Sequence, residues 1–70
     1  ILYMPRKIRD LLADYRSTGA FIERSGGKES HRKIKHPALH GTVILAGKDG
    51  EDAKQYQEKD LQLFMKAVGK

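Results

Sequence analysis

The two ends of the chain constrain its fold most, because each carries apolar residues at the spacing of a helix face. Apolar side chains at positions i, i+3, i+4 and i+7 line one side of an amphipathic helix. The N-terminal set is Ile8, Leu11, Leu12 and Tyr15, and the C-terminal set is Leu61, Phe64, Met65 and Val68. Pro5 suits a first helical position and Gly19 suits a helix end, so we predict the first helix over residues 5–17. A second helix closes the chain, with Gly69 as its stop.

Three segments between the two helical stripes have the composition of short strands. They are residues 20–24, 30–36 and 42–46. The third is apolar on both faces, which predicts a strand that is either covered on both sides or exposed for a partner. The order helix, three strands, helix predicts an α+β fold of the αβββα type, in which two helices cover one face of a three-stranded antiparallel sheet. A chain of 70 residues is expected to form a single small domain, 1–70.

The side chains of residues 30–36 divide between the two faces of the predicted sheet. Ile34 is the only apolar residue of this segment, so the face that it shares with Arg32 and His36 is expected to meet the core. The alternate residues, on the face that the helices leave open, are His31, Lys33 and Lys35.

Basic residues gather around this middle segment, and the whole chain has a net charge of +5. Residues 24–35 hold five basic residues against the single acid Glu29, whereas residues 49–60 are mainly acidic. Such a separation favours a polyanionic partner, because each neutralised phosphate releases counterions. A solvated surface run is the other interpretation of the same basic cluster.

His31 is the candidate for chemistry within the basic cluster. An imidazole can accept a proton from a ribose 2′-hydroxyl as general base, or protonate the leaving 5′-oxygen as general acid, near neutral pH. Lys33 is a candidate for stabilising the charge on the phosphoryl oxygens. The residues predicted to contact RNA are Lys28, Arg32, Lys33 and Lys35. The alternatives are a surface histidine without a role, lysines that only solvate a strand, and an Arg32 whose stem packs beside Ile34.

The remaining candidates are expected to have structural roles or none. His36 is expected to be structural, and His40 is assigned no role. His31 and His36 face opposite sides of the strand, and no carboxylate stands at ligand spacing from them, so no metal site and no cofactor are expected. The side chains expected to pack in the core rather than to stack on bases are Tyr15, Phe21, Phe64 and Met65, whereas Tyr3 and Tyr56 are freer to stack.

Three stretches of the chain resemble the HicA toxins of bacterial toxin–antitoxin modules. They are Gly-Gly-Lys-Glu-Ser-His-Arg-Lys at residues 26–33, the pair His36-Pro37, and residues 50–59. The family has a fold like that of double-stranded-RNA-binding domains. The resemblance therefore implies an endoribonuclease that cleaves mRNA, with His31 matching the catalytic histidine, and a HicB-type antitoxin as its partner. Many members have glycine where this chain has Glu29, a carboxylate that would weaken phosphate binding locally.

Two other classes of function fit the same sequence. A non-catalytic double-stranded-RNA-binding module would share the fold, but such domains begin their second helix with lysines, where this chain has Glu58-Lys59-Asp60. A protein-interaction domain would use the outer apolar side chains of residues 42–46. The chain has no cysteine and no apolar run of the ~18–20 residues that span a membrane, so a reducing, cytoplasmic location is expected.

Overall fold

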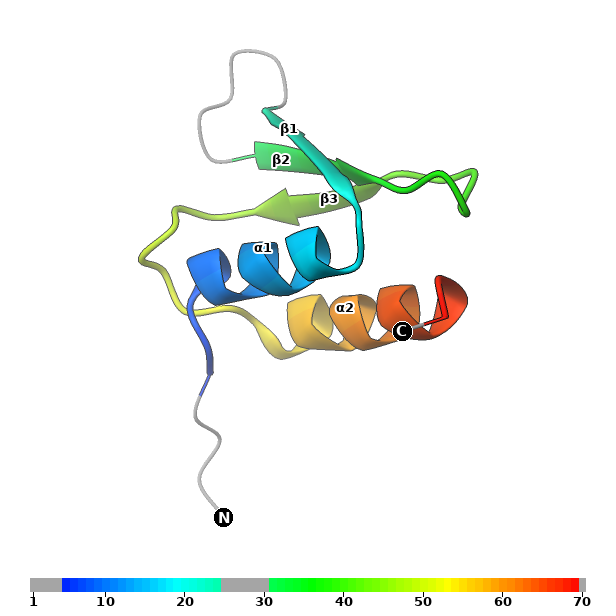
Figure 1. Cartoon of the computed structure of the whole chain (residues 1–70). Coiled ribbons are helices and arrows are strands. Elements are labelled where there is room, and N and C mark those ends of the chain that lie inside the picture. Colours follow the sequence, from blue (N-terminus) through cyan, green and yellow to red (C-terminus); the bar gives the residue numbers. More distant parts are fainter. Residues whose placement is uncertain (1–4, 25–30, 70) are drawn as a thin grey trace.

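The protein forms a three-stranded antiparallel sheet with both helices on the same side of it (Figure 1). The computed structural model describes residues 5–24 and 31–69. The elements in chain order are α1 (Ile8–Ser17), β1 (Phe21–Arg24), β2 (His31–Lys35), β3 (Val43–Ala46) and α2 (Gln55–Ala67). The strands lie in the order β1-β2-β3. The predicted α+β fold of the αβββα type is therefore confirmed.

The core lies between the sheet and the two helices, as the apolar stripes predict. All four members of the N-terminal stripe are buried, as are Leu61 and Phe64 of the C-terminal stripe, while Met65 and Val68 are partly buried against them. The rings of Tyr15 and Phe64 meet edge to face, with their centroids 4.9 Å apart, and so join α1 to α2. The sheet contributes Ile34 and Leu45 to the same cluster.

The first helix begins at Ile8, so the expectation that Pro5 opens it is wrong. The backbone before α1 is engaged elsewhere, because the carbonyl of Arg6 accepts a hydrogen bond from Ala53 N–H at 2.7 Å and Lys7 forms a β-bridge with Asp52. These tertiary contacts hold residues 6 and 7 extended. At the other end Gly19 has φ +91°, a left-handed conformation that favours glycine, and the helix stops as predicted.

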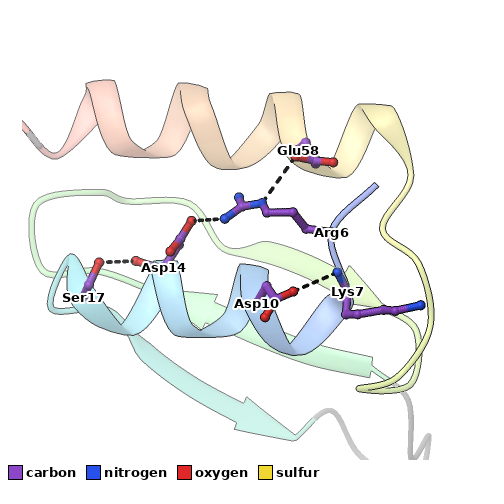
Figure 2. A network of polar contacts seen from close by, with 6 residues as sticks. All are labelled: Arg6, Lys7, Asp10, Asp14, Ser17 and Glu58. Atoms are coloured by element: carbon purple, nitrogen blue, oxygen red, sulfur yellow. Dashed lines mark hydrogen bonds and ion pairs between the residues drawn. The ribbon is translucent and has the colours of Figure 1, made fainter. Parts of the chain in front are cut away.

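A polar network ties the segment before α1 to both helices (Figure 2). Nη1 of Arg6 lies 2.7 Å from Oδ2 of Asp14 on α1, and Nε of Arg6 lies 3.5 Å from Oε1 of Glu58 on α2. The backbone N–H of Lys7 donates to Oδ2 of Asp10 at 3.1 Å, which satisfies one free donor at the helix start. Arg6 therefore bridges α1 and α2 at the side of the core that already joins them.

The strand register determines which side chains face away from the helices. Ile34 lies opposite Ile22 on β1 and opposite Val43 on β3, and all three contact the core. Alternate residues face the other way. We call that side the outer sheet face, and its members are Phe21, Glu23, His31, Lys33, Lys35, Ile44 and Ala46.

Candidate nucleic-acid interface

The outer sheet face brings His31, Lys33 and Lys35 together along β2, as the alternation predicts. Lys35 is exposed, whereas His31 and Lys33 are half-buried. The histidine is thus on the expected side of the sheet but more covered than a freely solvated residue. A half-buried imidazole beside lysines is a typical setting for proton transfer next to a bound phosphate.

One nitrogen of His31 is in an unusual state. Its Nδ1 atom is buried and has no hydrogen-bond partner within residues 5–24 and 31–69. Buried polar atoms are nearly always paired, and leaving one unpaired costs about 1–3 kcal/mol. A catalytic role is one of several explanations for such an exception, alongside local strain and a bound water or ion.

Lys35 also forms an ion pair across the two strands. Its Nζ atom lies 3.4 Å from Oε1 of Glu23, and both side chains are about half exposed. Exposed pairs of this kind contribute roughly 0–1 kcal/mol, so a phosphate could displace the carboxylate at little cost. Glu23 lies directly opposite Lys33 as well, and it is the acidic member of the outer sheet face.

Arg32 lies apart from the other predicted RNA-contacting residues of β2. Its side chain points to the helix side of the sheet and is only 14% exposed, with Nη2 2.7 Å from Oδ1 of Asp49. Its Nη1 atom is buried and unpaired among the residues that the structure describes. Arg32 therefore lies on the Ile34 face, as the alternation predicts, and its contact with RNA stays a prediction. Lys28 lies outside the described residues, as do Ser30 and the two glycines at positions 26 and 27.

The prediction that Phe21 packs in the core is wrong. Phe21 is 60% exposed on the outer sheet face, directly opposite Lys35. The reason is that Ile22 occupies the inward position, opposite Ile34, and only one of two adjacent strand residues can face the core. This signal was present in the sequence, since residues 21 and 22 are both large and apolar in a strand with one buried face.

An open pocket lies beside Phe21, at the end of β2 that is farther from His31. Its lining includes Phe21, Lys35, Pro37, Leu39, His40 and Thr42. It combines apolar walls with a lysine and a histidine, so it can accept a group that is both flat and charged. We call this the Phe21 pocket. His40, to which the sequence analysis assigned no role, is one of the residues that line this pocket.

His36 has the structural role that the sequence predicts. Its Nδ1 atom accepts the backbone N–H of Ala38 at 3.0 Å, so the ring proton is on Nε2, which donates to the carbonyl of Thr18 at 3.0 Å. The ring also meets Phe64 edge to face at a centroid distance of 5.9 Å. These contacts fasten the start of the β2–β3 connection to the end of α1.

Further observations bear on the other expectations. Across the described ranges no group of three or more His, Cys, Asp or Glu residues could hold a metal ion. None of the helices described is long and apolar enough to cross a membrane. Tyr56 is 57% exposed, but it lies on α2 and not on the outer sheet face.

Comparison with known proteins identifies no relative of this chain. No family model matches the chain, and neither a curated protein nor a solved structure matches it.

Proposed function

We propose that the protein is an endoribonuclease of the HicA toxin type that cleaves mRNA. The observation that carries the proposal is the outer sheet face, on which β2 aligns His31 with Lys33 and Lys35. The resemblance of residues 26–37 to the family's catalytic segment supports the same assignment.

The proposed reaction is in-line attack of the ribose 2′-hydroxyl on the adjacent phosphate. His31 takes the hydroxyl proton as general base, or gives a proton to the leaving 5′-oxygen as general acid. Lys33 stabilises the charge that spreads over the phosphoryl oxygens. One imidazole does not perform both proton transfers at once, so a second group or a water molecule performs the other. The products are a 2′,3′-cyclic phosphate and a 5′-hydroxyl.

The proposal includes a HicB-type antitoxin and a cytoplasmic location. Ile44 is 49% exposed on the outer sheet face, beside Lys33, its register partner. Apolar residues within a charged rim are typical of a protein interface. An antitoxin with acidic residues opposite the lysines would compete directly with the phosphates of RNA.

The αβββα order also favours a second candidate, a non-catalytic double-stranded-RNA-binding module. Such a module would contact RNA through the start of the second helix. In this chain the first turns of α2 hold Glu58 and Asp60 beside Lys59, and Glu58 already pairs with Arg6. The mixed charge makes this the weaker candidate.

The test of the proposal is the variant His31→Ala, assayed on RNA with the purified protein. Cleavage should fall by about 10²–10⁴-fold, the usual contribution of a general acid or base. The matched control is Gln62→Ala, which shortens an exposed side chain on α2, away from the outer sheet face, and should leave fold and cleavage unchanged. A folded His31→Ala protein that cleaves RNA at the wild-type rate would refute the mechanism. Circular dichroism of both variants separates loss of chemistry from loss of fold.

A further inference from the structure

We infer that the Phe21 pocket is a nucleotide subsite for single-stranded RNA. The base of one unpaired nucleotide stacks on the Phe21 ring, and the Nζ atom of Lys35 binds its phosphate. That the ligand is RNA rests on the proposed function. The subsite itself is additional to it, because the proposed role of His31 does not involve Phe21.

The pairing of Phe21 with Lys35 is the first observation behind this subsite. The two residues lie directly opposite each other on β1 and β2, and both are exposed on the outer sheet face. Side chains opposite each other in an antiparallel pair start about 4.5–5.5 Å apart at Cβ. An aromatic ring next to a cation matches a nucleotide, which presents a flat base next to an anion.

The walls of the pocket are held in place before any ligand binds. His36 is fixed by Thr18 and Ala38, and its carbonyl accepts the backbone N–H of Leu39 at 3.0 Å. The turn from residue 36 to residue 39 therefore holds Pro37 and Leu39 beside Phe21. A preformed site loses little conformational entropy on binding.

The position of the pocket relative to His31 makes it a neighbouring subsite and not the reaction centre. Lys35 lies four positions after His31 on β2, or ~13 Å away at 3.3 Å per residue. Lys33 lies between them on the same face. RNA that runs along β2 would thus contact three side chains in turn and place a base on Phe21 beyond the scissile bond. Because a base inside a duplex is already stacked, the subsite favours single strands.

Fluorescence can test the stacking directly, because the chain contains no tryptophan. Phe21→Trp in the His31→Ala background gives a single reporter in a protein that lacks the proposed proton-transfer group. Single-stranded oligoribonucleotides should quench this reporter, and a duplex of the same sequence should quench it less. The matched control is Tyr56→Trp, which places a reporter of similar exposure on α2 and should be quenched little.

Affinity, measured by the anisotropy of labelled RNA, gives a second test. Phe21→Ala removes an exposed ring and should weaken single-strand binding by about 5- to 150-fold, which corresponds to the 1–3 kcal/mol of one stacked base. Glu23→Gln should strengthen binding, because it frees Lys35 from the ion pair.

The outcomes separate this inference from the proposed function. RNA that binds and is cut while Phe21→Trp stays unquenched overturns the subsite and leaves the nuclease intact. The subsite is supported if Phe21→Trp is quenched and Phe21→Ala binds more weakly, even where His31→Ala fails to reduce cleavage. Quenching of Tyr56→Trp alone would show that RNA binds at α2 and would overturn the subsite. If RNA does not bind the protein at all, both proposals are overturned.

Discussion

Ile22 on β1 lies directly opposite Ile34 on β2, and this apolar pair fixes the facing of both strands. Ile34 is fully buried, and Ile22 packs against the same core. Because strand residues alternate between faces, the neighbouring pair, Phe21 and Lys35, lies on the outer sheet face. The facing of the candidate site is therefore a consequence of core packing.

Loss of charge on the outer sheet face should change how RNA binding depends on salt. Lys33→Gln and Lys35→Gln should each lower the slope of log affinity against log salt by about 0.7, if each lysine contacts one phosphate of a single strand. Lys59→Gln, on the exposed side of α2, is the charge-matched control and should leave the slope unchanged. The measurement is anisotropy of labelled RNA between 50 and 200 mM salt, about the range in which phosphate contacts show clearly. If all three variants have the same slope as the unsubstituted protein, RNA does not bind through Lys33 and Lys35, and the interface lies elsewhere on the protein.

Cleavage should persist in excess EDTA, because the proposed mechanism uses an imidazole and lysines rather than a metal-bound water. The RNA fragments should carry 5′-hydroxyl ends, which can be labelled directly by a polynucleotide kinase. Activity that disappears on chelation and returns with magnesium or manganese would contradict this. Fragments with 5′-phosphates would instead indicate attack by water.

Tyr15 should make the fold sensitive to alkaline pH. Burial, together with the negative charge of Asp60, raises the pKa of its hydroxyl to about 12 from an ordinary 10. Above pH 10 the unfolded chain loses this proton before the folded one does. The Tyr15 contribution to the free energy of unfolding is therefore complete below pH 10 and is lost as the pH rises toward 12, by up to about 1.4 kcal/mol per pH unit.

Tyr15→Phe isolates that contribution, since the hydroxyl oxygen is buried and unpaired among the described residues. Removal of an unpaired buried polar group is expected to be neutral or stabilising at pH 7. Denaturant unfolding of both proteins between pH 8 and 11.5, roughly the window set by the two pKa values, should show a shallower fall for the variant. Parallel curves would mean that the Tyr15 hydroxyl titrates alike in both states.

An antitoxin should inhibit by covering the outer sheet face. Amide exchange or NMR mapping of the complex should show protection at His31 and around Ile44, which lies beside Lys33 at the interface that we propose. RNA should then compete with the antitoxin for the protein. Protection confined to α1 and α2, with RNA still bound, would show that inhibition is indirect.

The sequence alone determined the elements and their order, because the signals for these are local. The apolar stripes of α1 and α2 need only helical spacing, and Gly19 ends the first helix through its own left-handed backbone. The shared face of His31, Lys33 and Lys35 follows from strand alternation once Ile34 is placed inward. These features could be predicted without any contact between distant segments.

Only the tertiary structure decided what each side chain of the site touches. Arg32 meets Asp49, which is 17 positions away, so a predicted RNA contact is engaged by a carboxylate that no local pattern indicates. Ile22 faces the core and Phe21 faces outward, because the register of β1 with β2 places Ile22 opposite the buried Ile34. Local spacing favours a helix or a strand, whereas burial, pairing and the start of α1 depend on segments that meet only when the chain folds.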